Sequence, residues 1–312
     1  MGTIAVTGSV AFDTIMVFPG RFAEHIISDQ AHILNVSFLV DRLEKRRGGT
    51  AANIAYNLAL LGERPLLCAA VGNDFAEYGA ALSAVGVDTS GALMFDDIPT
   101  ATSFITTDAD DNQITAFYAG AMGRAARVDL AVLSGVEHVV VAPDAPDGMG
   151  LHIEQAAKLQ ARLVFAPAQQ LSSMSDETLV AGLEAAWLLV GNDYEFQVIQ
   201  RRTGRDPEAL ASGGAMVALT RGGQGSELRV GGEVRSIPVA QPQALVDPTG
   251  AGDAYIAGLL AGLRAGRDPG VAARMGALAA AYVIEQQGPQ SHSYTREQFA
   301  DRYARSFGNA LT

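Results

Sequence analysis

The chain has 312 residues, of which 48% are hydrophobic and 18% are charged, a composition typical of a globular protein with a large apolar core. Its 34 acidic and 22 basic residues give a net charge of −12, which argues against nucleic acid or an anionic membrane as a partner. The single cysteine, Cys68, excludes an internal disulfide. Because Cys68 lies in an apolar stretch, we expect it to be a buried structural thiol in a reducing compartment. The opening residues also lack the basic stretch of a signal peptide, so we expect a cytoplasmic protein.

Short apolar runs alternate with helix-like stretches along most of the chain. Beyond residue 250 the pattern is helical to the end. Alternation of this kind predicts an α/β fold with a parallel sheet covered by helices on both faces. The predicted strands are 4–6, 66–71, 136–142, 162–165, 187–190 and 215–219, and the predicted helices between them are 50–61, 150–159, 175–184 and 193–201.

Two segments break the alternation. Residues 14–47 and 101–118 carry Thr, Phe, Ile and Val in extended runs, with a turn-like stretch at 108–113. We interpret them as a small β lid inserted twice, and a pair of ordinary surface hairpins is the alternative. The large domain then comprises residues 1–13, 48–100 and 119–312, with Asp13 just beyond the end of the first strand, where α/β sheets bind ligands.

The most informative stretch is 247–260, a glycine-rich turn that leads into an apolar helix. Gly250 and Gly252, on either side of Ala251, allow a tight turn, and the helix N-terminus behind them favours an anion. Asp253 could then remove a proton from an attacking hydroxyl group. A kinase needs both features, an anion cradle and a base. The alternative is that Asp253 only caps the helix.

Three further motifs carry both a functional and a structural interpretation. In Gly48-Gly49-Thr50-Ala51-Ala52-Asn53, the glycines could hinge a lid and Asn53 could hold a hydroxyl group, or the pair could simply end a loop. Asn192 and Glu195 have the spacing of a capping box and also suit a shell of Mg²⁺-bound waters. The glycines of 220–225 could admit a nucleotide or form a plain turn.

Other phosphate and metal motifs are missing. A Walker A loop needs a Lys after its last Gly, and neither Lys45 nor Lys158 has that setting. Gly250-Ala251-Gly252 lacks the third glycine of a dinucleotide fingerprint. The five His residues show no metal-ligand spacing, so neither a zinc site nor a Ser-His-Asp triad is supported.

The order of the motifs is more specific than any one of them. An Asp after the first strand is followed by Gly-Gly-x-Ala-Ala-Asn, Asn-x-x-Glu, Thr-x-Gly-x-x-Gly and Gly-Ala-Gly-Asp. Over essentially its whole length the chain resembles the ribokinase-like (PfkB) kinases. Within that family it looks most like the bacterial-type adenosine kinases, through the strings Phe12-Asp13-Thr14-Ile15, Phe18-Pro19-Gly20-Arg21-Phe22, Asn35-Val36-Ser37-Phe38-Leu39-Val40, Phe117-Tyr118-Ala119-Gly120-Ala121-Met122 and Asn192-Asp193-Tyr194-Glu195.

The resemblance implies a ribokinase-like three-layer αβα domain, with a mostly parallel central sheet and a β-sheet lid. It also implies ATP- and Mg²⁺-dependent phosphorylation of the 5′-hydroxyl of adenosine, giving AMP and ADP. Asp253 becomes the base, and the amides of Gly250, Ala251, Gly252 and Asp253 form the anion hole. The nucleoside would contact Ser9, Asp13, Ser37, Gly48, Gly49, Asn53, Phe104, Phe117, Gln169 and Gln170, the two phenylalanines by stacking on the base.

The same resemblance places the second substrate and the metal ions. Residues implied at the ATP site are Asn192, Thr220, Arg221, Gly222, Gly223 and Gly225. Asn192 and Glu195 would bind Mg²⁺ through water, and Asp247 with loop 288–293 would be the place for a monovalent cation such as K⁺. Arg46 and Arg47 could touch phosphates when the lid closes, or form a solvated face.

One departure from the family and three alternatives remain. Relatives commonly carry Asp where this chain has Ala166, which alters the polar network near the acceptor. A broader nucleoside kinase, or a sugar kinase for ribose or fructose, is the main alternative, since few contacts set specificity. A noncatalytic nucleoside sensor is a more remote one. A homodimer formed through the lid is also expected.

Overall fold

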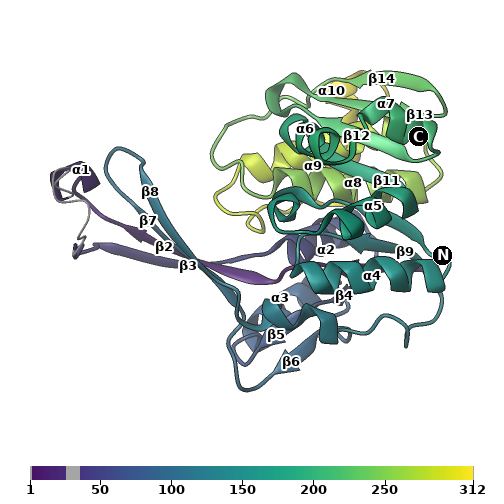
Figure 1. Cartoon of the computed structure of the whole chain (residues 1–312). Coiled ribbons are helices and arrows are strands. Elements are labelled where there is room, and N and C mark those ends of the chain that lie inside the picture. The colour runs from purple at the N-terminus through teal and green to yellow at the C-terminus, as the bar shows by residue number, and fades with distance from the viewer. Residues whose placement is uncertain (1, 26–35, 312) are drawn as a thin grey trace.

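An eight-stranded sheet forms the centre of the protein (Figure 1). The structure is a computed structural model that describes residues 2–25 and 36–311. Six of its strands, β4, β1, β9, β10, β11 and β12, run parallel. At one edge, β13 and β14 form an antiparallel hairpin that the sequence pattern did not predict. Their order is β14 (Glu233–Ile237), β13 (Ser226–Val230), β12 (Met216–Thr220), β11 (Ala186–Asn192), β10 (Arg162–Phe165), β9 (Val136–Val141), β1 (Thr3–Thr7) and β4 (Leu66–Cys68).

Helices cover both faces of this sheet, which confirms the predicted three-layer α/β fold. Successive residues of a strand point to opposite faces, so Val140 packs in one apolar cluster while Val139 and Val141 pack in the other. The first cluster includes side chains of α2 (Thr50–Leu60), α3 (Ala76–Val85), α8 (Ala251–Arg264), α9 (Pro269–Ile284) and α10 (Arg296–Phe307). The second includes side chains of α4 (Pro146–Lys158), α5 (Asp176–Ala185), α6 (Asp193–Thr203) and α7 (Pro207–Ser212).

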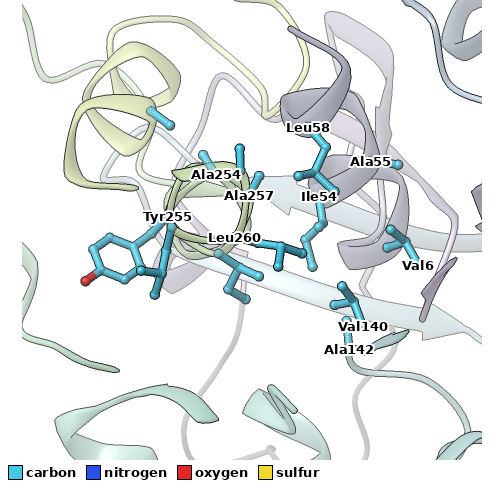
Figure 2. Close-up of a cluster of buried hydrophobic side chains, with 14 of the residues drawn as sticks. Val6, Ile54, Ala55, Leu58, Val140, Ala142, Ala254, Tyr255, Ala257 and Leu260 are labelled. Atoms are coloured by element: carbon cyan, nitrogen blue, oxygen red, sulfur yellow. The ribbon is translucent and has the colours of Figure 1, made fainter. Parts of the chain in front are cut away.

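Helices α2 and α8 lie together against the middle of the sheet. Figure 2 shows Ile54 and Leu58 of α2 near Ala254 and Ala257 of α8, with Val140 of the sheet in the same cluster. All five side chains are fully buried. This packing is what places the N-terminal turns of two helices from distant parts of the chain at one edge of the sheet.

Two predicted elements differ from the structure. Helix α4 begins at Pro146 rather than 150, because a proline is well suited to the first helical position. The predicted strand 66–71 divides into β4 and β5 (Ala70–Gly72), and β5 pairs with β6 (Leu93–Phe95) in a separate two-stranded sheet. At the end of β5, Gly72 approaches the backbone at Pro99 too closely for any side chain.

A four-stranded sheet projects from the body as the predicted lid (Figure 1). Its order is β3 (Arg42–Gly48), β2 (Ala11–Val17), β7 (Ala101–Thr107) and β8 (Gln113–Tyr118), with α1 (Phe22–His25) near its outer end. The predicted turn at 108–113 joins β7 to β8, and residues 26–35 of the predicted lid lie outside the described part. Since β2 begins at Ala11, Asp13 is a lid residue and not the last residue of the large domain, as its position along the sequence had suggested.

Short 3₁₀ helices complete the body: η2 (Gly120–Arg127), η3 (Ala168–Ser172) and η4 (Gly222–Gln224). Cys68 is buried, and burial raises the pKa of its thiol to about 12, in keeping with the structural role predicted for it. Within the described residues, no helix is both long and apolar enough to span a membrane.

The contact between α8 and α9 generates a stability prediction. A Cβ atom added at Gly258 would lie 2.6 Å from the Met275 carbonyl and 2.7 Å from the Gly276 Cα. Overpacking of this kind costs about 1–3 kcal/mol, so we expect Gly258→Ala to lower the free energy of unfolding measured in urea. Gly150→Ala is the control, because its methyl group meets Thr178 no closer than 3.6 Å. An unchanged or raised stability for Gly258→Ala would contradict the proposed close packing.

Candidate active site

A cleft of about 500 Å³ opens where the lid meets the carboxyl edge of the central sheet. Side chains and backbone from the lid, from η3 and from the starts of α2 and α8 line it. The structure thus gathers eleven of the predicted site residues in one cleft: Ser9, Asp13, Gly48, Gly49, Asn53, Phe117, Gln169, Gln170, Gly250, Gly252 and Asp253. They come from segments far apart in the sequence, and the fold alone brings them together.

Asp253 lies in the first turn of α8, at the wall of the cleft. Its Oδ2 accepts a 2.8 Å hydrogen bond from Nδ2 of Asn53, which lies in the first turn of α2. Burial raises the pKa of the Asp253 carboxyl to about 7, although the Asn53 hydrogen bond opposes the rise. A carboxylate with a pKa near neutrality is suited to accept a proton and release it again.

The turn before Asp253 can receive an anion. Gly250 is the N-cap of α8 and has φ of +83°, a left-handed conformation that favours glycine, and no side chain caps the helix. The Ala251 amide donates to the Pro248 carbonyl at 3.2 Å, so this amide is already engaged and Ala251 does not line the cleft. The first-turn amides of Gly252 and Asp253 have no intrahelical acceptor, which leaves them as the donors at this end of the helix.

A glycine pair joins the lid to the body. Gly49 has φ of +91°, and a Cβ atom there would lie 2.5 Å from the backbone nitrogen of Ala11. Only glycine therefore fits between β3 and α2. The adjacent Thr50 is fixed by Ser9, whose hydroxyl accepts a 3.1 Å hydrogen bond from the Thr50 amide. The predicted hinge is a tightly packed junction in this conformation of the chain.

Asp13 brings a carboxylate from the lid into the cleft. It pairs with Arg46 on β3 and with Ser103 on β7, and residues that pair directly across strands share a face of the sheet. Burial raises the pKa of Asp13, the positive charge of Arg46 lowers it, and the negative charge of Asp247 raises it. The cleft thus contains two carboxyl groups with raised pKa values, one on the lid and one on the body.

The two phenylalanines predicted to stack on a base are separated by the lid sheet. Phe117 pairs with Ser103, and both line the cleft. Phe104 is the next residue along β7, so it points to the opposite face, where 43% of its surface is exposed. Phe104 therefore does not line the cleft in this conformation, whereas Phe117 does. Stacking of either ring on a base stays a prediction.

Ser37 is also not in the cleft. It lies next to Phe38, whose ring packs on Phe18 and Phe22 near the outer end of the lid, and its surface is exposed. The predicted contact of Ser37 with a nucleoside is thus absent from this arrangement. A hydroxyl group that sequence analysis missed, that of Ser103, occupies the cleft face of the lid instead.

The residues predicted for ATP lie at the ends of β11 and β12. Asn192 pairs with Thr220 in the sheet register, so the two motifs are side by side. Asn192 and Glu195 form a complete capping box, in which the backbone amide of Asn192 donates to a Glu195 carboxylate oxygen at 2.9 Å. Burial raises the pKa of Glu195. No group of three or more His, Cys, Asp or Glu side chains among residues 2–25 and 36–311 is arranged to hold a metal ion.

The glycine motif after β12 divides into residues with different roles. Gly222 and Gly223 have open space around them, as a loop that admits a ligand requires. At Gly225, φ is +85° and a Cβ atom would lie 2.2 Å from the Ile237 carbonyl, so this glycine serves the turn itself. Arg221 points to Glu227, 3.2 Å away on β13, which makes it a structural partner in this conformation.

Asp247 holds the loop behind the anion cradle. Its carboxylate accepts 2.9 Å hydrogen bonds from the amides of Thr249 and Gly288, and Arg46 lies 3.9 Å away. Burial acts to raise the pKa of Asp247, but these hydrogen bonds and Arg46 outweigh it, and the pKa is lowered. The carboxylate therefore stays charged between the lid and the 288–293 loop.

Several residues that line the cleft were not predicted. They are Ala11, Thr50, Ser103, Met122, Pro143, Ala168, Thr249 and Pro289. Thr50 belongs to the glycine motif itself, and the two-residue period of β7 could have set Ser103 apart from Phe104. The others became visible only through tertiary contacts. Ala166, the position at which the resemblance leads one to expect an Asp, is buried just after β10.

Comparison with known proteins agrees with this geometry. The model of the pfkB family of carbohydrate kinases matches residues 7–296. The chain belongs to this family. Its fold is the ribokinase-like one, with a mostly parallel central sheet and a small separate sheet.

Several proteins similar to this chain are nucleoside kinases. A nucleoside kinase of Methanothermobacter thermautotrophicus is 29% identical over 309 residues, which cover 98% of this chain and 96% of that protein. The structure of Burkholderia thailandensis nucleoside kinase in complex with inosine has 35% identity and a TM-score of 0.88, with 99% of each chain covered. The same enzyme in complex with ADP-inosine has 36% identity and a TM-score of 0.86, covering 99% of this chain and 97% of that one.

The raised pKa of Asp253 generates a prediction about stability. The folded protein holds a proton on Asp253 up to a pH of about 7, whereas the unfolded chain releases it near 3.8, the ordinary pKa of an Asp side chain. The contribution of this group to stability is therefore complete at low pH and is lost as the pH rises through 7. We expect Asp253→Asn to be close to the wild type in stability at pH 4 and to exceed it at pH 8 by on the order of 4 kcal/mol. Urea unfolding at both pH values measures this, and a variant less stable at pH 8 would contradict it.

Proposed function

We propose that this protein is a purine nucleoside kinase that transfers the γ-phosphoryl group of ATP to the 5′-hydroxyl of its substrate. The observation that carries the proposal is the pairing of Asp253 with Asn53 at a helix N-terminus, in the same cleft as Phe117 and the Gln169-Gln170 pair. One set of residues suits proton removal and anion binding, and the other suits a planar base. Adenosine is the acceptor that the sequence motifs favour.

Inosine is a second acceptor that specific observations favour. The Burkholderia enzyme was solved with inosine, and the amides of Gln169 and Gln170 can present either an oxygen or an NH₂ group. An amide oxygen accepts a hydrogen bond from the amino group of adenine, and an amide NH₂ donates one to the carbonyl of hypoxanthine. A broad purine nucleoside specificity follows from this chemistry.

The residues of the chain divide the reaction between them. Asp253 removes the proton of the 5′-hydroxyl, and its pKa of about 7 matches the pH at which a cell works. Asn53 keeps the carboxylate in place through its hydrogen bond. The free amides of Gly252 and Asp253 stabilise negative charge on the transferred group. Asp13 and Ser103, on the lid, are placed to bind the ribose hydroxyls.

The ends of β11 and β12 suit the phosphoryl donor. ATP with Mg²⁺ supplies the transferred group and neutralises charge on its phosphates. Thr220 and the open glycines 222 and 223 leave room for a nucleotide beside the sheet edge. Asn192 and Glu195 fit a role through water, because Mg²⁺ held by phosphates keeps several of its waters. Asp247, charged and next to the 288–293 loop, is where we propose a monovalent cation such as K⁺.

The lid supplies what the body lacks. In the structure it projects from the body, yet Asp13, Ser103 and Phe117 already face the cleft. Movement about the Gly48-Gly49 junction would bring these side chains over a bound nucleoside and exclude water, which otherwise competes as the phosphoryl acceptor.

A panel assay tests the proposed activity. We expect the wild type, with ATP and Mg²⁺, to phosphorylate adenosine and inosine and to leave ribose and fructose essentially unchanged. Asp253→Asn should lower kcat by about 10²–10⁴, the usual contribution of a general base, while the nucleoside Kd from calorimetry stays within about threefold. Asp96→Asn, an exposed carboxylate on the body, is the matched control. Preference for a free sugar would overturn the substrate class, and full activity of Asp253→Asn would overturn the role of the base.

We also propose that two copies associate through the outer face of the lid, the face away from the cleft. Leu43, Phe104, Ile114 and Tyr118 alternate along β3, β7 and β8 on this face, and between 43% and 68% of each side chain is exposed. An apolar surface of this kind is stabilised when a second copy covers it.

Sedimentation velocity tests this association. We expect a dimer for the wild type and a monomer for Phe104→Glu, because a charge buried in the interface would lack a partner. Val132→Glu, with an equally drastic change at a residue that is 77% exposed on the body, should leave the dimer intact. A monomeric wild type would refute the proposal.

A further inference from the structure

A chain of hydrogen bonds connects Asp253 to the lid junction. Asn53 Nδ2 donates to Asp253 at 2.8 Å, and Gln290 Nε2 donates to Asn53 Oδ1 at 2.8 Å. The same Gln290 nitrogen lies 2.5 Å from the Tyr78 hydroxyl, which in turn donates to the Gly48 carbonyl at 2.7 Å. Two of these residues, Gln290 and Tyr78, do not line the cleft.

The direction of each bond is fixed by chemistry. An amide NH₂ group can only donate, so Gln290 must meet the oxygen end of the Asn53 amide. The nitrogen end of Asn53 then has to face Asp253. Without Gln290, the Asn53 amide could rotate and present its oxygen to the carboxylate, which would repel it. Asn53 is 4% exposed and Tyr78 is 1% exposed, so water does not readily replace a lost partner.

Gln290 is itself held firmly. Its loop begins at Gly288, whose amide donates to Asp247, and continues to His292, whose carbonyl accepts a hydrogen bond from the Tyr56 hydroxyl. The ring of His292 also meets Asn57 at 2.9 Å, so α2 and the loop are joined at several points. Next to Gln290, Pro289 packs against Gly250, where an added Cβ atom would lie 2.5 Å from it. The loop therefore supports both the anion cradle and Asn53.

We infer that Gln290 is a positioning residue that fixes the Asn53 amide so that it donates to Asp253, and that Tyr78 links this arrangement to the lid junction at Gly48. The inference rests on the proposed function only where turnover is measured. Its physical content is that the protonation of Asp253 depends on a side chain that touches neither substrate.

Other charges surround this network and have to be separated from it. Asp13 on β2, Arg46 and Arg47 on β3, and Asp247 before α8 are charged side chains that act on this part of the protein. A substitution of Gln290 by an uncharged residue leaves all four in place. A change in the pKa of Asp253 would then show that the Asn53 amide no longer donates to it in the same way.

The direct experiment compares Gln290→Met with the wild type. We expect the acid limb of the kcat/KM profile to move to higher pH by roughly 0.5–1 unit, because Asp253 loses the donor that stabilises its charged form. At pH 7 the rate should fall about two- to sixfold, with the nucleoside KM changed less than kcat. Gln287→Met, an exposed residue three positions earlier, is the matched control. An equal loss of activity at every pH would overturn the inference.

Tyr78→Phe separates the two halves of the chain of bonds. It leaves the Gln290–Asn53 hydrogen bond but removes the donor of the Gly48 carbonyl, so we expect a higher nucleoside KM and an unmoved acid limb. An acid limb that shifts as far in Tyr78→Phe as in Gln290→Met would contradict this division. Gln290→Ala, which removes the same donor without added bulk, replaces the methionine variant should that one fail to fold.

A measurement without turnover distinguishes this inference from the proposed function. The protein is labelled with ¹³C at the Asp carboxyl carbons, and Asp253→Asn identifies the Asp253 signal. The titration midpoint of that signal should be higher in Gln290→Met than in the wild type and in Gln287→Met. If the wild type were inactive on every nucleoside, the proposed function would be refuted, but the titration of Asp253 would still test the role of Gln290. An unshifted midpoint in Gln290→Met would refute that role.

Discussion

The hydrogen bond between Asn53 and Asp253 depends on the way α2 and α8 pack. Both helices bury their apolar faces on the same side of the central sheet, and Ile54 and Ala254, the residues that follow the polar pair, are fully buried. The core thus fixes the distance between two polar side chains at its edge. Because the carboxylate is partly desolvated there, its pKa rises towards neutrality, and a single amide becomes important for its charge.

The lid completes the site from the opposite side. Its strands alternate, so every second residue faces the cleft and the residues between them face outward. Asp13, Ser103 and Phe117 therefore form a polar and aromatic cleft surface, while Phe104 and its neighbours form an apolar outer surface. The two-residue period alone gives this small sheet one face that lines the cleft and one apolar outer face.

The 288–293 loop joins these parts. It contacts Asp247, Asn53 and Tyr78, so it touches the turn before α8, the start of α2 and the helix that holds the lid junction. Its sequence shows no motif that would single it out for this role. A polar side chain in a loop becomes significant only when the fold surrounds it with buried partners.

The sequence by itself determined the α/β class, the lid insertions and the glycine-rich turn with Asp253, because these follow from local periodicity and from the backbone freedom of glycine. It did not separate Phe104 from Phe117, place Asp13 in the lid or divide residues 66–71 between two sheets, since these depend on strand pairing over long distances. Only the tertiary structure joined Gln290 and Tyr78 to Asn53. Hydrogen bonds between residues more than 200 positions apart leave no periodic signal in the chain.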